Sequence, residues 1–226
     1  MTEVRNNFES HQGEAQPDFK LPDFSDIAEN GLYVPELERD ACGVGMVANI
    51  TGAQSHEIID QALEVLVNLG HRGAAGADPL TGDGAGITIQ MPDAFMREVA
   101  AQEGFELPAA RRFGVAMCFL PVDDELNAAA RASLESSATS NGMEILGWRE
   151  VPTDPSVIGI TARAIMPKIA QLFVSAPEGV EGDDLERVLY LARKTTEKNF
   201  VDGESDPKTK QTLRREFYVS SWSSRT

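Results

Sequence analysis

Cys42 is the residue of this sequence best suited to covalent chemistry. A cysteine attacks as a thiolate, so it needs a base nearby to take the thiol proton. The sequence holds three histidines, and their spacing alone assigns none of them to Cys42. Cleavage of the chain before Cys42 would supply a base, because the new α-amine has a pKa of about 7.7–8.0 and lies beside its own sulfur. The alternative is a small residue buried in a core strand, which is also our interpretation of Cys118.

A glycine-rich stretch, residues 71–86, carries the other candidate groups. Its five glycines in sixteen residues predict a loop that turns sharply or approaches another group closely. Arg72 would favour the thiolate form of a nearby cysteine, or else pair with Asp78 or Asp83 as a structural cation. Asp83 either lines a substrate pocket or shapes the turn, and His71 is expected to stabilise a helix end rather than act as a base. The stretch lacks a Gly-Lys-Ser/Thr sequence, which argues against a phosphate-binding loop.

Strands and helices in alternation must position these groups. Hydrophobic periodicity and turn residues predict, in order, a buried strand at 42–50, a helix at 55–69 capped by Ser55 and stopped by Gly70, a strand at 87–91 and a helix at 93–103. The second half adds a strand at 113–120, a helix at 123–141 capped by Asp123 or Asp124, strands at 144–151 and 169–175, a helix at 185–200 capped by Asp183 or Asp184, and a strand-like tail at 217–222. This order indicates an α/β or α+β chain.

The composition narrows the class of protein. The 226 residues are 42% hydrophobic and 25% charged, which is typical of a globular chain, although residues 1–30 are polar and expected to be loosely attached. A net charge of −16 argues against nucleic-acid and membrane-surface binding. Two cysteines form no zinc pattern and no disulfide framework. Neither a membrane-spanning stretch nor a secretory signal is visible, so a cytoplasmic location is expected.

Several segments, in this order, resemble the class II glutamine amidotransferase domain at the start of a glutamate synthase large chain. That domain belongs to the N-terminal nucleophile hydrolases. An Arg-Gly after the first helix is shared by class II amidotransferases, and a Gly-Asp-Gly-Ala-Gly loop is particular to glutamate synthases. The resemblance runs from about residue 33 to the end and rests on Asp40 to Gly45, His71 to Gly73, Thr81 to Gly86, Gly147 to Pro152, Arg163 to Ile169, Leu189 to Lys194 and Phe217 to Thr226.

The resemblance implies a fold, a division of the chain and a site. The fold would be an α+β, four-layer αββα sandwich, incomplete at its C-terminus. Residues 1–41 would be a propeptide removed on maturation, and residues 42–226 a partial amidotransferase domain. Cys42 would attack the side-chain amide of L-glutamine, with its α-amine as the base. Arg72, Asp83 and Gly84 would bind the substrate, and no metal is expected.

The resemblance also implies partners and limits. In the family, an Asn-Gly pair that forms the oxyanion hole, and an arginine and aspartate that hold the substrate, lie beyond Thr226. So does a synthase domain with FMN and an iron–sulfur cluster, which reductively aminates 2-oxoglutarate with electrons from ferredoxin or a small NADPH-oxidising subunit. We therefore expect weak or no glutaminase activity from residues 1–226 alone. The alternatives are the glutaminase domain of another class II amidotransferase and a non-catalytic domain with an uncleaved propeptide.

Overall fold

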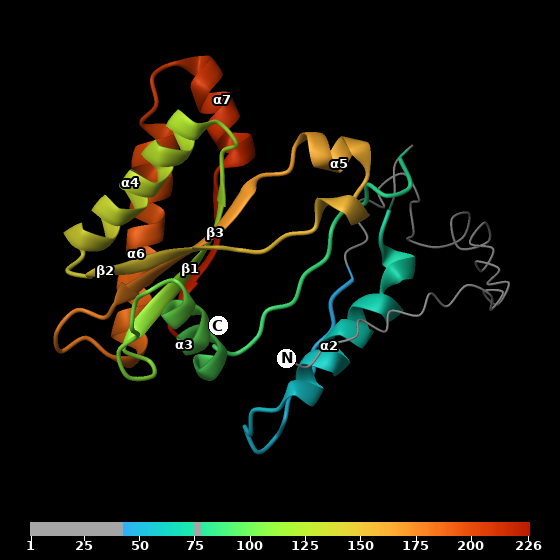
Figure 1. The fold of residues 1–226 in the computed structure, drawn as a ribbon, viewed down its shortest axis with the longest axis horizontal. Helices are drawn as coiled ribbons and strands as arrows, with labels where there is room; N and C mark the ends of the chain where they lie inside the picture. The colour runs from blue at the N-terminus through green and yellow to red at the C-terminus, as the bar shows by residue number, and fades with distance from the viewer. Residues whose placement is uncertain (1–42, 75–77) are drawn as a thin grey trace, which may run out of the picture. The chain divides into compact units, whose positions relative to one another are not determined.

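The computed structural model describes residues 43–74 and 78–226 (Figure 1). Its helices and strands follow in the order α2 (His56–Asn68), η2 (Gly70–Arg72), α3 (Asp93–Gln102), β1 (Phe113–Leu120), α4 (Asp124–Ser140), β2 (Ile145–Glu150), η3 (Pro155–Val157), α5 (Ile160–Ala164), β3 (Lys168–Ser175), α6 (Gly182–Thr196), η4 (Glu197–Asp202), α7 (Pro207–Glu216) and β4 (Tyr218–Ser223).

The four strands form one antiparallel sheet in the order β2-β3-β1-β4. β1 and β3 pair without irregularity, from Phe113 opposite Ser175 to Leu120 opposite Lys168. β4 pairs with the other side of β1, and its register shifts between Met117 and Cys118. The two central strands are nearly continuous apolar runs because they carry core side chains on both faces.

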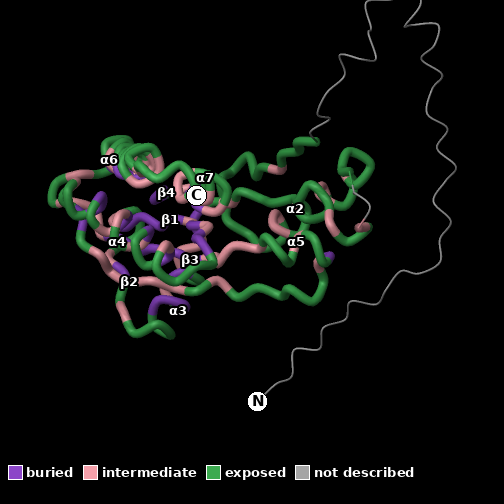
Figure 2. Tube along the Cα trace, turned by 90° about the horizontal axis from the view of Figure 1, so that it is seen from above, coloured by how far each residue is buried: buried purple, intermediate pink, exposed green. Residues whose placement is uncertain are grey.

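Helices α4 and α6 cover one face of the sheet, and α3 covers part of the other (Figure 1). Alternate residues of the strands fill the layer under α4 and α6, among them Ala116, Cys118 and Leu120 from β1 and Ala170, Leu172 and Val174 from β3. The layer under α3 contains Met96, Val99, Phe113, Val115 and Phe173. Figure 2 shows that the buried residues gather in this part of the chain, whereas α2 and α5 are largely exposed.

Most of the predicted elements are confirmed. The strands expected at 113–120, 144–151, 169–175 and 217–222 correspond to β1, β2, β3 and β4, and the helices expected at 55–69, 93–103, 123–141 and 185–200 correspond to α2, α3, α4 and α6. The prediction of a mixed helix and strand chain is therefore confirmed in its α+β form, because the sheet is antiparallel.

The strands predicted at 42–50 and 87–91 are wrong for their described residues. Residues 43–50 and 87–91 run without strand structure. Val44 and Met46 expose 90% and 88% of their surface. A strand forms only where a neighbouring strand accepts and donates its backbone hydrogen bonds, and hydrophobic pattern alone does not supply that neighbour.

Of the three predicted helix caps, one is confirmed and two need correction. Asp123 caps α4 as expected, with its side chain accepting a hydrogen bond from the Leu126 amide at 2.9 Å. Ser55 occupies the N-cap of α2, but its side chain makes no capping hydrogen bond. α6 begins after Glu181, so Asp183 and Asp184 lie inside its first turn, where a carboxylate still interacts favourably with the helix dipole.

The predicted end of α2 is confirmed to within one residue, because α2 ends at Asn68 with Leu69 as its C-cap, and Gly70 opens the 3-10 turn η2. Two helices were not predicted at all. α7 starts at Pro207 after the capping residue Asp206, and α5 is a single short turn. The Asp206-Pro207 pair was a usable helix-start signal in the sequence.

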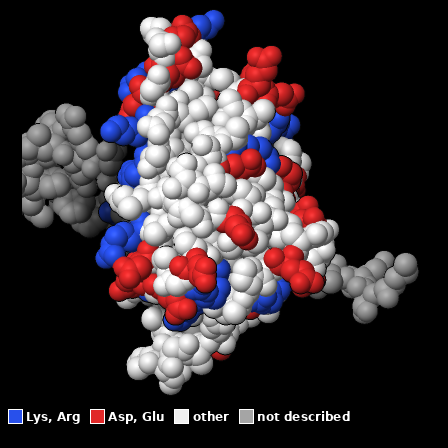
Figure 3. All heavy atoms as spheres, turned by 90° about the vertical axis from the view of Figure 1, so that its left-hand side faces the viewer, with Lys and Arg blue, Asp and Glu red and all other residues white. Residues whose placement is uncertain are grey.

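The described surface carries mixed charge. On the face shown in Figure 3, acidic and basic side chains are interspersed among uncharged residues. Within residues 43–74 and 78–226, no helix is both long enough and apolar enough to cross a membrane.

Candidate active site

The described chain begins one residue after the predicted nucleophile. Cys42 and the proposed propeptide, residues 1–41, lie outside the described residues. Gly43 packs against the end of α2, where an added Cβ would lie 3.0 Å from Leu69 Cδ2 and 3.2 Å from Arg72 Cβ. A side chain at Gly43 would therefore push against the stem of Arg72. A Cβ at Gly45 would collide with the Val65 side chain, so the chain after Cys42 approaches α2 closely at two glycines.

Arg72 lies in η2, directly after α2. Its amide donates a hydrogen bond to the Leu69 carbonyl at 2.8 Å, which fixes the backbone where the side chain begins. Within the part of the chain that the structure describes, Arg72 forms no ion pair with Asp78 or Asp83, the partners considered in the alternative structural interpretation. The Cβ and Cγ atoms of Arg72 instead lie against Gly43, the residue that follows Cys42.

The side chains of His71 and Asp83 both form hydrogen bonds with nearby backbone groups. The Nδ1 atom of His71 lies 2.9 Å from the Asn68 carbonyl, at the end of α2, as expected for a histidine that stabilises a helix end. Asp83 accepts a hydrogen bond from the Ala74 amide at 2.8 Å, and its own amide donates to the Ala74 carbonyl at 3.2 Å. Asp83 therefore closes the glycine loop on itself. Gly84 follows with a φ of 81°, a conformation that glycine adopts readily.

A second set of contacts, which the sequence did not predict, joins residues 78–81 of the glycine-rich stretch, here called the glycine loop, to α5. The Asp78 carboxylate accepts hydrogen bonds from the Thr81 hydroxyl at 2.8 Å and from the Thr161 amide at 3.2 Å. The Ala162 amide donates to the Thr81 hydroxyl at 3.2 Å, and the Gly159 amide donates to the Leu80 carbonyl. The hydrogen bonds from Thr81 and then Thr161 lower the pKa of Asp78 below its usual value.

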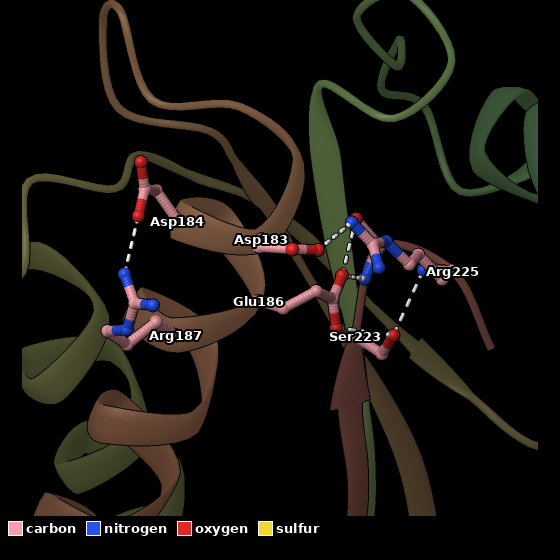
Figure 4. Close-up of polar contacts among 7 residues, drawn as sticks. Asp183, Asp184, Glu186, Arg187, Ser223 and Arg225 are labelled. Atoms are coloured by element: carbon pink, nitrogen blue, oxygen red, sulfur yellow. Dashed lines mark hydrogen bonds and ion pairs between the residues drawn. The ribbon is translucent and has the colours of Figure 1, made fainter.

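A third cluster fixes the chain that leaves β4 (Figure 4). Glu186 on α6 accepts hydrogen bonds from the Ser223 hydroxyl at 2.8 Å and from the amide and hydroxyl of Ser224. Arg225 pairs with Asp183, and its carbonyl accepts a hydrogen bond from the Met91 amide at 2.6 Å. The cluster thus links α6 to the end of the segment that follows the glycine loop.

An open groove of about 820 Å³ runs beside the chain after Cys42. It is lined by the extended segments 43–49 and 86–90 and by the half-buried side of α2. Most of its lining is aliphatic, with Ile58, Ile59 and Val65 among its residues. Glutamine carries polar groups at both ends, so this lining suits a protein segment better than it suits that substrate.

Cys118 is a core residue, as predicted. It lies fully buried in β1, and burial raises the pKa of its thiol to about 12. A protonated, inaccessible thiol is a poor nucleophile. Across the described ranges, no cluster of three histidine, cysteine, aspartate or glutamate side chains is arranged to hold a metal ion.

Comparison with known proteins decides the family. Residues 42–226 match the model of the family described as class-II glutamine amidotransferases. The chain belongs to this family. The match begins at Cys42 and includes Arg72, Asp83 and Gly84, the residues singled out above.

Similar proteins of the class II amidotransferase family are much longer than this chain. It is 39% identical over 189 residues to ferredoxin-dependent glutamate synthase 2 of Synechocystis, which covers 84% of the chain and 11% of that protein. It is 39% identical over 168 residues to the glutamate synthase [NADPH] large chain of Bacillus subtilis, and this match covers 74% of the chain and 11% of that protein. It is 35% identical over 205 residues to chloroplastic ferredoxin-dependent glutamate synthase 2 of Arabidopsis thaliana, and this match covers 90% of the chain and 12% of that protein. The chain thus spans about an eighth or less of these relatives.

Proposed function

We propose that this chain is the glutamine-hydrolysing domain of a glutamate synthase. The observation that carries the proposal is the family match that starts at Cys42, together with the packing of Gly43 against Arg72. A nucleophile at a new N-terminus would need no histidine, because its α-amine serves as the base. Removal of residues 1–41 would create that terminus, and residues 42–226 would form the amidotransferase domain.

In the proposed reaction, the Cys42 sulfur attacks the side-chain amide carbon of L-glutamine. The α-amine of Cys42 takes the thiol proton and delivers it to the departing nitrogen, which leaves as ammonia. A γ-glutamyl thioester remains on the sulfur. Water then attacks the thioester carbonyl, with the same amine accepting a proton, and glutamate and the free thiol are released. The balance is one glutamine and one water consumed for one glutamate and one ammonia formed.

Arg72 would act in this site through its charge. A guanidinium close to the sulfur favours the thiolate, and its position beside Gly43 supports that role. Asp83 and Gly84 are proposed to line the glutamine site from the loop that follows. The hydrogen bonds between Asp83 and Ala74 hold these two residues together and do not involve the Arg72 side chain.

We also propose the four-layer αββα sandwich as the complete fold. The face of the sheet away from α4 and α6 is only partly covered by α3, and its residues Tyr218 and Phe119 are exposed and half-buried respectively. The extended, apolar segments 43–49 and 86–90 line one groove and lack strand neighbours within the described residues. Both features would be satisfied by a second sheet that includes these two segments.

In the longer protein, the ammonia would react with 2-oxoglutarate at a synthase domain, and the imine would be reduced to a second glutamate. FMN and an iron–sulfur cluster would serve that reduction, with ferredoxin or an NADPH-oxidising subunit as the electron source. The residues of this chain do not fit the cluster, because it has two cysteines and one of them is buried in the core. A cytoplasmic location stays a prediction.

The first test is the N-terminus of the purified chain. Intact-mass analysis should show loss of residues 1–41, and the new Cys42 thiol should react with iodoacetamide near neutral pH. In the longer protein, which would supply the rest of the glutamine site, glutamine should slow that alkylation, whereas asparagine, one methylene shorter, should protect far less. A chain that keeps residues 1–41 would support the non-catalytic alternative. Equal protection by both amino acids would contradict a glutamine site.

A second test addresses Arg72. The pH at which alkylation of Cys42 is half-maximal reports its thiol pKa. R72M removes the cation and should raise that pH by about one unit, whereas R72K keeps the charge and should shift it less. An unchanged midpoint in R72M would remove Arg72 from the proposed site.

A further inference from the structure

Helix α5 lacks a side-chain cap of its own. Its N-cap residue is Gly159, which offers no side-chain acceptor to the amides of the first turn. Those amides are nevertheless bonded, Thr161 N to Asp78 Oδ2 and Ala162 N to Thr81 Oγ1, each at 3.2 Å. The acceptors come from a turn that lies 81 or more residues earlier in the chain. The glycine loop therefore caps α5 from a distance.

The turn that supplies these acceptors is held together by the same groups. The Thr81 hydroxyl donates to the Asp78 carboxylate at 2.8 Å while it accepts from the α5 amide, so its proton and a lone pair are both used. The Thr81 amide donates to the Asp78 carbonyl at 2.9 Å. In return, the Gly159 amide donates to the Leu80 carbonyl at 2.8 Å.

Gly159 is required by the closeness of this contact. A Cβ at Gly159 would collide with both Asp78 Oδ2 and Thr81 Oγ1. The carboxylate and hydroxyl thus lie against bare backbone, which lets two short segments of distant sequence share one hydrogen-bond network. The contact therefore depends on the side chains of Asp78 and Thr81 and on the absence of a side chain at Gly159.

The joined turn leads directly into the proposed glutamine site. Thr81 is followed by Gly82, Asp83 and Gly84, and Asp83 bonds back to Ala74, two residues after Arg72. Fixing Thr81 on α5 therefore fixes one end of the segment that carries Asp83. The other end is held by the Asp83 to Ala74 hydrogen bonds.

We propose that Asp78 and Thr81 are positioning residues, which hold the loop segment of Asp83 and Gly84 in place by capping α5. The inference rests on the proposed function, because it assigns the loop to glutamine binding. Neither residue needs to touch the substrate. Their effect on glutamine would pass through the loop backbone, so the hydroxyl of Thr81 matters more than its methyl group.

The matched variants T81V and T81S test the cap itself. Valine keeps the shape of threonine but removes the donor and the acceptor, whereas serine keeps both. Amide hydrogen exchange of Thr161 and Ala162 should speed up by about tenfold or more in T81V and stay within about twofold of the wild type in T81S. D78N, which removes the charge but keeps the shape, should fall between them. Equal exchange in T81V and the wild type would overturn the cap.

Glutamine protection of Cys42 against iodoacetamide, measured in the longer protein, tests the positioning role. The glutamine concentration for half-protection should rise about tenfold in T81V and little in T81S, while the alkylation rate without glutamine stays the same in all variants. Faster exchange in T81V with an unchanged half-protection concentration would overturn the positioning role. If glutamine fails to protect the wild type, the proposed function fails and the positioning role fails with it, while the exchange rates still decide the cap.

Discussion

Removing the Glu186 carboxylate should destabilise the sheet-bearing part of the chain. Glu186 is partly buried on α6 and accepts hydrogen bonds from three donors on Ser223 and Ser224. These two serines expose only 8% and 4% of their surface. The E186A variant would leave an amide and two hydroxyls without their acceptor in a site that water reaches poorly.

The magnitude follows from the number and kind of hydrogen bonds. A hydrogen bond to a charged group contributes about 1.5–3 kcal/mol, and a buried donor left unpaired costs about 1–3 kcal/mol. The three bonds share one carboxylate, so their effects do not add in full. We expect E186A to lower the free energy of unfolding by about 3 kcal/mol. E186Q keeps one oxygen acceptor and should cost about 1 kcal/mol.

The neighbouring Arg187 supplies the control. It pairs with Asp184 on the exposed side of the same helix, with 67% and 75% of the two side chains exposed. R187A should change the free energy of unfolding by about 0.5 kcal/mol or less, since exposed pairs contribute little. Urea unfolding followed by circular dichroism measures all three variants, provided that the slope m stays constant. An E186A effect as small as that of R187A would refute the assignment of Glu186 as an anchor.

Three further predictions concern the thiol, the loop and the core. Iodoacetamide at pH 8 should modify one thiol of the native chain and two after unfolding, because burial raises the pKa of Cys118 to about 12; two modified thiols in the native chain would contradict its burial. Hydrogen bonds to the Asp78 carboxylate lower its pKa, so their stabilising effect is complete at any pH above the usual aspartate pKa. The effect is lost as the pH falls through the lowered pKa, so hydrogen exchange of the first α5 amides should accelerate only in strong acid. G114A should cost about 1–3 kcal/mol, since its Cβ would lie 2.6 Å from a Leu189 methyl, and L189A should relieve part of that cost.

The elements predicted correctly are those whose pattern and neighbours both lie in the described chain. β1 is an apolar run at 113–120, and it pairs with β3 along its whole length. Segment 87–91 has an equally strand-like pattern, yet among the described residues its one backbone hydrogen bond to a distant segment runs from the Met91 amide to the Arg225 carbonyl. Hydrophobic pattern reports which side chains need cover, whereas strand structure also depends on a partner backbone.

The candidate site was predicted unevenly for a similar reason. Arg72 and the glycine loop stand out because unusual residues follow one another in the sequence. The contact of Arg72 with Gly43 and the cap that Asp78 gives to α5 join residues far apart, so no local spacing signals them. α5 itself was missed because its first turn is bonded by acceptors from another segment and its own residues contain no capping signal.

The segment that leads into the proposed glutamine site contributes little to the buried core. α2 contains no fully buried residue, whereas β1, β3 and the helices beside them form the core. Among the described residues, the contacts of Asp78 and Thr81 with α5 join this segment to the core. The hydrogen bond from the Met91 amide to the Arg225 carbonyl, beside the serines that Glu186 holds, also joins them. Substitutions at these joints should therefore affect the proposed glutamine site without any contact between the changed residue and glutamine. A site on a segment with few buried residues depends on the contacts that hold the segment in place as much as on its reactive groups.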